Sequence, residues 1–93
     1  MLKPLEELVN IIRERKDSNS EKSYTNKLLN DKKMCVTKVN EEINELIEAI
    51  EKNDNKIHEA ADVFYHLLVL LESSEIKIED VLQELKKRQN EIR

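Results

Sequence analysis

Four carboxylates in two pairs are the residues of this sequence best suited to chemistry. Glu42 and Glu45 form one pair, and Glu59 and Asp62 form the other. Residues three apart lie on one face of a helix, with Cβ atoms roughly 5–6 Å apart, so each pair points in one direction. Two such helices packed antiparallel would bring the four groups together, and their repulsion favours a bound divalent cation. Oxygen ligands suit Mg²⁺ or Mn²⁺, and Mg²⁺ works with phosphate substrates.

The segment from residue 56 to residue 72 is the main physical support for a metal site. Apolar side chains cover most of its circumference, which is typical of a buried helix. One polar stripe interrupts them, made by His58, Glu59, Asp62 and His66. Ionised groups on a buried helix are costly unless they are paired or bound to a metal. We expect His58 to be exposed near a turn, and His66 to be an interior histidine bonded to a carboxylate or a backbone carbonyl.

Hydrophobic periodicity predicts the helices that position these groups, and Ser23 and Asp31 are the expected N-caps of two of them. The chain has no glycine, so Asn53-Asp54-Asn55 has to make the tight turn between the two carboxylate helices. The predicted fold is all-α, a compact antiparallel bundle of four to five helices in a single domain over residues 1–93. The expected helices span residues 4–16, 24–29, 32–52, 56–72 and 79–91.

Composition excludes several classes of function. The 93 residues carry a net charge of −4, with lysine and arginine interleaved with glutamate, so we expect no nucleic-acid binding. No apolar run reaches the length of a membrane span and the N-terminus has no signal-peptide pattern, which predicts a cytoplasmic protein without a membrane partner. A single cysteine, Cys35, fits a reducing compartment and is expected in the core. The absence of glycine also argues against a phosphate-binding loop.

Two other interpretations compete with a magnesium or manganese site. A helix rich in glutamate commonly presents a solvated face, so Glu41, Glu42 and Glu45 alone would be a weak signal. A di-iron carboxylate bundle needs Glu-x-x-His, and no glutamate lies three residues before either histidine.

The wide apolar surface of the helix at 56–72 is more than a chain of this length covers, which predicts a homodimer.

Three segments together resemble a known family. The pattern Glu-Glu-x-x-Glu at 41–45, followed by Glu-x-x-Asp at 59–62, resembles the MazG-like superfamily of all-α nucleoside-triphosphate pyrophosphohydrolases. The segments Ser23-Tyr24-Thr25-Asn26-Lys27-Leu28-Leu29 and Val63-Phe64-Tyr65-His66-Leu67-Leu68 are similar to the phosphoribosyl-ATP pyrophosphohydrolases within it. The resemblance runs from about residue 5 to residue 88. Asn40 and Asn53-Asp54 stand where that family usually has glycine, which affects local geometry and removes no implied ligand.

The resemblance implies an activity and a site. The activity is Mg²⁺-dependent, or Mn²⁺-dependent, hydrolysis of phosphoribosyl-ATP to phosphoribosyl-AMP and pyrophosphate, the second step of histidine biosynthesis, in a cytoplasmic homodimer. It implies metal ligation by Glu42, Glu45, Glu59 and Asp62, with Glu41 orienting or activating water. The implied substrate-binding residues are Lys22, Ser23, Tyr24, Thr25 and Lys38. Related domains are sometimes fused to the phosphoribosyl-AMP cyclohydrolase, so association with that enzyme is also an expectation.

Two other functions stay open on the sequence. One is a house-cleaning pyrophosphohydrolase that acts on non-standard or deoxynucleoside triphosphates, because the carboxylate pattern serves both activities. The other is a helical interaction module in which the acidic residues are only structural.

Overall fold

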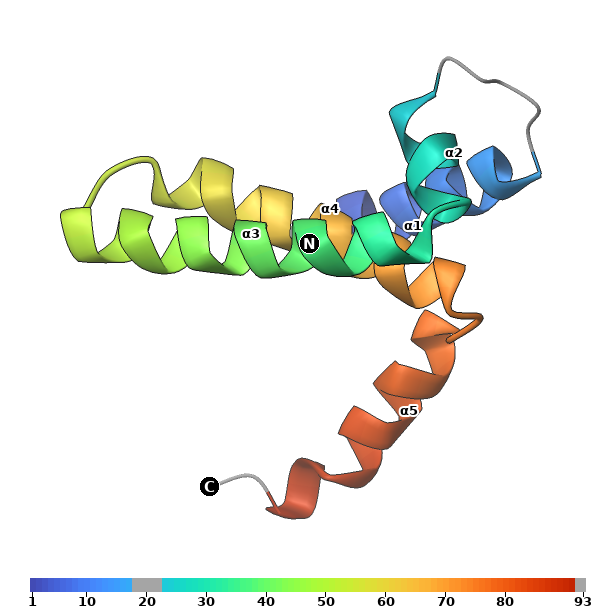
Figure 1. Ribbon diagram of the computed structural model, residues 1–93. Helices are drawn as coiled ribbons and strands as arrows, with labels where there is room; N and C mark the ends of the chain where they lie inside the picture. Colours follow the sequence, from blue (N-terminus) through green and yellow to red (C-terminus); the bar gives the residue numbers. More distant parts are fainter. Residues whose placement is uncertain (18–22, 92–93) are drawn as a thin grey trace.

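The structure, a computed structural model, describes residues 1–17 and 23–91. Within this part the chain is helical and forms a bundle with one projecting arm (Figure 1). The all-α prediction is therefore confirmed, and the predicted helix bounds agree closely for the first four helices. The elements are α1 (Lys3–Lys16), α2 (Tyr24–Leu29), α3 (Lys32–Lys52), α4 (Lys56–Ser73), α5 (Ile78–Lys87) and the short 3-10 helix η1 (Gln89–Glu91).

The antiparallel pair of α3 and α4 forms the centre of the bundle, and these two helices lie side by side over most of their length (Figure 1). The turn between them uses left-handed backbone conformations at Asn53 (φ 54°) and Asn55 (φ 57°). Asparagine tolerates this region better than most residues other than glycine, as predicted for a chain without glycine. This turn sets the register in which the side chains of α3 face those of α4.

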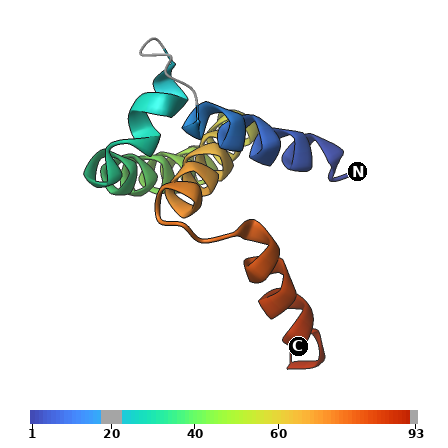
Figure 2. The ribbon, with the colours of Figure 1, turned by 90° about the vertical axis from the view of Figure 1, so that its right-hand side faces the viewer.

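Helices α1 and α2 pack against one end of this pair, where the core of the molecule lies (Figure 2). The predicted caps are confirmed, since Ser23 Oγ accepts from the Asn26 N–H and Asp31 Oδ1 accepts from the Met34 N–H at 3.1 Å. Cys35 is buried in the core, as expected, and its thiol donates to the Leu28 carbonyl. The buried residues that form this core come from α1, α2, α3 and α4: Ile12, Leu28, Cys35, Leu68 and Val69.

Helix α5 leaves the bundle as an arm (Figures 1 and 2). An ion-pair network fastens its first turn, because Arg13 donates to both carboxylate oxygens of Glu79, one of them at 2.9 Å, and also faces Glu72 at 3.6 Å. The prediction that this helix runs to residue 91 is wrong. It ends at Lys87, and the chain tightens into η1. Residues 86–91 are all polar, so this stretch has no apolar side chain to pack against another helix.

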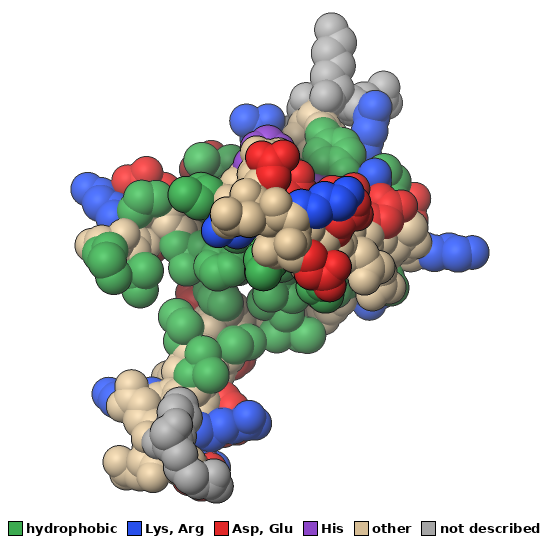
Figure 3. Space-filling model, turned by 90° about the vertical axis from the view of Figure 1, so that its left-hand side faces the viewer, with side chains coloured by type: hydrophobic (Ala, Val, Ile, Leu, Met, Phe, Trp, Pro, Cys, Tyr) green, Lys and Arg blue, Asp and Glu red, His purple; other side chains and the backbone are tan. Residues whose placement is uncertain are grey.

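Several helices keep apolar side chains exposed, α4 among them, so the expectation that α4 is buried nearly all round is only partly met. Phe64 on α4 is 58% exposed, Ile47 on α3 is 49% exposed and Leu82 on α5 is 55% exposed. Figure 3 shows hydrophobic side chains continuing from the bundle onto the projecting arm. In the described part of the chain, no helix is both long enough and apolar enough to span a membrane.

Candidate active site

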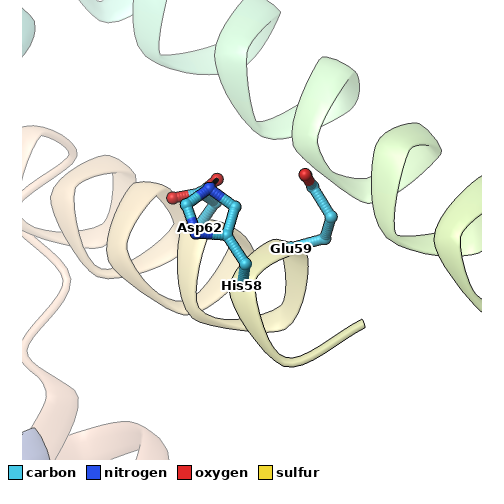
Figure 4. Close-up of side chains that lie close together, drawn as sticks. All are labelled: His58, Glu59 and Asp62. Carbon is cyan, nitrogen blue, oxygen red and sulfur yellow. Dashed lines mark ion pairs between the residues drawn. The ribbon is translucent and has the colours of Figure 1, made fainter. Parts of the chain in front are cut away.

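The antiparallel pair brings carboxylates from two helices together. Glu42 and Glu45 lie on α3 and Glu59 lies on α4, and one carboxylate oxygen of each lies within 4.8 Å of the other two. Figure 4 shows Glu59 reaching from α4 toward α3. Residues seventeen positions apart meet here because the Asn53–Asn55 turn reverses the chain, so the cluster is a product of the helical hairpin rather than of one helix.

Asp62 lies on the α4 side of this cluster. It groups with His58 and Glu59, whose potential ligand atoms also lie within 4.8 Å of one another. His58 Nε2 is 3.4 Å from Asp62 Oδ2, and the two side chains lie beside each other in Figure 4. Glu59 therefore belongs to both groups. His58 is exposed, as expected, yet it contacts a residue that was expected to bind metal.

Burial and mutual repulsion make the cluster electrostatically unfavourable. Burial raises the pKa of Glu42 above the ordinary value of 4.5, and the neighbouring Glu45 adds to the shift. Burial likewise raises the pKa of Glu59, again with a contribution from Glu45. Within the described residues, one oxygen of Glu42 and one of Glu59 are buried without a hydrogen-bond partner. A buried carboxylate oxygen left without a partner is costly, so a positive ligand at this position would stabilise both oxygens.

The donor set fits a hard divalent cation. One potential ligand oxygen from each of the three carboxylates lies within 4.8 Å of the other two, so a small cation between the helices can be shared by all three. Carboxylate oxygens are the preferred ligands of Mg²⁺ and Mn²⁺. Glu42, Glu45 and Glu59 therefore form a candidate metal centre, with Asp62 beside it.

Lys38 and Glu41 lie on α3 next to this centre. Lys38 Nζ is 3.3 Å from Glu41 Oε2, and both side chains are partly exposed. Lys38 is one turn before Glu42, so its ammonium group lies on the same side of the helix. The pair holds a cation beside the carboxylates, where a phosphate group could replace Glu41 as its partner.

The start of α2 is connected to α4 through side chains. The Tyr24 hydroxyl lies 3.2 Å from His66 Nε2, and the hydroxyls of Thr25 and Tyr65 share a hydrogen bond. Ser23 caps the same helix, so three of the expected substrate-binding residues lie in one ordered segment. Lys22, the fourth residue expected in this segment, lies outside the described residues.

Tyr65 and His66 were not among the predicted site residues, although they contact two of them. His66 is an interior histidine bonded to a backbone carbonyl, as expected, since its Nδ1 lies 2.9 Å from the Asp62 carbonyl oxygen. The available signal was its position one turn after Asp62 on the polar stripe of α4. Its contact with Tyr24 joins residues 42 positions apart, which helical periodicity does not predict.

Comparisons with known proteins identify the family of this chain. The family model described as phosphoribosyl-ATP pyrophosphohydrolase matches residues 5–89. The phosphoribosyl-ATP pyrophosphatase of Clostridium novyi is 45% identical over 95% of this chain and 83% of its own length. That of Clostridium acetobutylicum is 47% identical over the same shares.

A third relative is longer than this chain. The histidine biosynthesis bifunctional protein HisIE of Pyrococcus furiosus is 42% identical over 90% of this chain, which corresponds to 40% of its own length. In that protein the matched region is thus one part of a larger polypeptide. The family match extends through all five helices, including both carboxylate helices and the α2 segment. This chain belongs to the phosphoribosyl-ATP pyrophosphohydrolase family.

Proposed function

We propose that this chain hydrolyses phosphoribosyl-ATP to phosphoribosyl-AMP and pyrophosphate, a step of histidine biosynthesis. The observation that carries the proposal is the cluster of Glu42, Glu45 and Glu59 at the interface of α3 and α4, within a chain that belongs to this family. Two of these carboxylates each keep a buried oxygen without a partner among the described residues. Carboxylates of a merely solvated acidic surface would instead have their oxygens exposed to water.

Mg²⁺, or Mn²⁺ in its place, is the proposed cofactor. Glu42, Glu45 and Glu59 would hold it, and Asp62 would complete the ligand set from α4. When bound, the cation would neutralise phosphate charge and orient a water molecule for in-line attack. The carboxylates would supply the negative charge that balances the cation. Burial first, and then repulsion by neighbouring carboxylates, raises the pKa values of Glu42 and Glu59, and a cation would relieve both effects.

The side chains of this chain would divide the remaining work. Lys38 would contact phosphate oxygens as a point charge after leaving Glu41. The water oxygen forms a bond to phosphorus, the bridging P–O bond between the α- and β-phosphates breaks, and pyrophosphate leaves. A carboxylate would take the proton from the water, and Glu41 would orient or activate that water once Lys38 has turned to the phosphates.

A pyrophosphate-release assay tests the proposal. The purified chain with Mg²⁺ is expected to release pyrophosphate from phosphoribosyl-ATP and to be much slower on a panel of deoxynucleoside and non-standard nucleoside triphosphates. Activity on the panel without activity on phosphoribosyl-ATP would instead identify a house-cleaning enzyme. No turnover of any nucleotide would favour an interaction module.

A homodimer is the proposed assembly. Apolar side chains on α3, α4 and α5 are roughly half exposed, and exposed apolar surface of this extent is typical of a contact surface. A second copy carries the same apolar surface and would cover it symmetrically. We also expect association with the cyclohydrolase that uses the product, because the Pyrococcus relative is named as a bifunctional protein. Co-sedimentation of the two purified proteins would test this association.

A further inference from the structure

Three rings form a compact cluster between α2 and α4. Tyr65 and His66 pack edge to face with their centroids 4.9 Å apart, and Tyr24 lies 6.0 Å from His66 and 6.4 Å from Tyr65. Edge-to-face and offset arrangements are the favourable geometries of aromatic pairs. The cluster contains both tyrosines of the chain, and it joins the expected substrate segment to the helix that carries Glu59 and Asp62.

The hydrogen bonds of His66 determine its tautomer. Nδ1 lies 2.9 Å from the Asp62 backbone carbonyl, which can only accept, so Nδ1 carries the proton in the neutral ring. Nε2 is then an acceptor, and the Tyr24 hydroxyl, 3.2 Å away, must donate to it. His66 is 8% exposed, so water does not readily replace either partner. The Tyr24 proton is directed at α4, and the oxygen lone pairs remain available on the other side.

Charged groups on α3 act on that hydroxyl. Burial raises the pKa of Tyr24 above its ordinary value of 10.0, and the Lys38 cation opposes the shift, while Glu42 adds to it. The hydroxyl is therefore protonated at neutral pH and lies within the field of both α3 groups. A second bond, between Thr25 and Tyr65, holds the next residue of α2 to the same helix.

We propose that Tyr65 and His66 are positioning residues, which hold Tyr24 and Thr25 against the helix that carries Glu59 and Asp62 and keep the Tyr24 hydroxyl as an acceptor toward the nucleotide. This proposal rests on the proposed function. Because the Tyr24 proton is engaged by His66, Tyr24 can accept from a hydroxyl or amino group of the substrate, whereas contact with phosphate is left to Lys38. His66 itself does not touch the substrate and acts through Tyr24.

A double-variant cycle on KM tests the positioning. Tyr24→Phe removes the hydroxyl, and His66→Leu removes the acceptor that orients it. Each is expected to raise KM for phosphoribosyl-ATP by about 2- to 10-fold with kcat little changed, because one hydrogen bond of substrate binding is lost. The double variant should be no worse than either single variant. His66→Gln, which retains an acceptor near the Nε2 position, should recover part of the loss.

Nitrogen NMR gives a readout that does not depend on turnover. The chain has two histidines, so a His58→Gln sample assigns the His66 ring signals. The wild type should show a protonated Nδ1 and an unprotonated Nε2, and Tyr24→Phe should shift the Nε2 signal. Ser73→Ala, which removes a hydroxyl bond at the far end of α4, is the matched control and should change neither KM nor the spectrum.

The outcomes separate this proposal from the proposed function. Effects on KM that multiply in the double variant, in chains with wild-type helical content, would overturn the positioning proposal. So would an Nε2 signal that Tyr24→Phe leaves in place. A wild-type chain without activity on phosphoribosyl-ATP would refute the proposed function, and the nitrogen spectra would still decide whether His66 orients Tyr24.

Discussion

At the scale of single residues, the buried oxygens of Glu42 and Glu59 are the feature that favours a bound cation at this site. Neither has a hydrogen-bond partner within the described part of the chain, and both side chains face Glu45. Exposed glutamates on the same helix behave differently, since Glu48 forms an ordinary ion pair with Lys52. Position relative to α4, rather than residue type, thus distinguishes the clustered carboxylates from this surface ion pair.

Glu45→Gln is expected to lower kcat/KM by about a hundredfold or more, because a metal centre supplies several kcal/mol of transition-state stabilisation. The helical content should be unchanged. Steady-state pyrophosphate release measures the effect. Glu48→Gln is the matched control on the same helix and should keep wild-type activity. Equal losses in the two variants would argue against a specific centre.

The raised pKa values of Glu42 and Glu59 predict an unusual pH dependence of stability. A carboxyl whose pKa is raised by folding binds more protons in the folded than in the unfolded chain above the ordinary value of 4.5, so stability falls as pH rises through the raised values. The metal-free chain should therefore unfold at a higher temperature near pH 5 than at pH 7. Mg²⁺ should raise the unfolding temperature more at pH 7, because protons compete with metal at lower pH.

Glu79 contributes to stability over a different pH range. Its hydrogen bond to Arg13 lowers the pKa from 4.5 to about 2, so its contribution is present above 4.5 and is lost as pH falls toward 2. Thermal unfolding across pH, with and without Mg²⁺, resolves both pH ranges.

Glu42→Gln should reduce the difference in unfolding temperature between pH 5 and pH 7. An unfolding temperature of the metal-free wild type that rises steadily from pH 5 to pH 7 would contradict the prediction for Glu42 and Glu59.

At the scale of elements, the turns are where the absence of glycine costs stability, because residues with a Cβ atom adopt left-handed backbone conformations there. Glu75, between α4 and α5, has a left-handed backbone with φ 59°. This conformation costs a residue with a Cβ atom roughly 1–2 kcal/mol, whereas glycine adopts it freely at an entropic cost of about 0.5–1 kcal/mol. The connection that aims the α5 arm therefore contains local strain, while Arg13 and Glu79 hold the arm in place.

Glu75→Gly is expected to stabilise the chain by about 0.5–1 kcal/mol, because it removes that strain. Chemical denaturation measures the change in the free energy of unfolding. Ser74→Gly is the control next to it, since Ser74 has φ −96° and gains nothing from glycine. It should destabilise the chain slightly. If both variants shift stability in the same direction, strain at residue 75 is not the cause.

At the scale of the whole molecule, exposed apolar surface predicts assembly. The bundle buries a small core at one end, while α3, α4 and the arm present apolar side chains to solvent (Figure 3). A chain of 93 residues is marginal when folded alone, and a second copy would add the missing burial. The carboxylate cluster is formed within one chain, so the dimer would stabilise the hairpin that carries it.

Ile47→Lys should weaken the dimer by about tenfold or more, because Ile47 is 49% exposed on the apolar side and burying a charge there is unfavourable. Light scattering over a range of micromolar concentrations should show a mass near the dimer for the wild type and a lower mass for the variant. Asn10→Lys on α1 introduces the same charge on an exposed polar position and should leave the mass unchanged. A wild-type mass of one chain at every concentration would exclude the dimer.

Helix existence, caps and turn could be predicted from local sequence. Apolar periodicity predicted α1 to α4 within a residue or two, and Ser23 and Asp31 capped helices as expected because capping depends on residues three positions away. The spacing of Glu42 and Glu45 also determined that they share a face. The prediction for the end of α5 was wrong, since periodicity does not show where a helix stops when the polar residues 86–91 offer it no packing.

Only the tertiary structure decided which groups meet. The Asn53–Asn55 turn placed Glu59 against Glu42 and Glu45 while Asp62 lies with His58, a register that the period of a single helix cannot specify. It also brought Tyr24 to His66 and Thr25 to Tyr65 across 42 and 40 positions. The sequence by itself determined the helices and the chemistry on their faces, because both depend on near neighbours. Contacts between helices depend on how the faces pack, so they follow only from the folded chain.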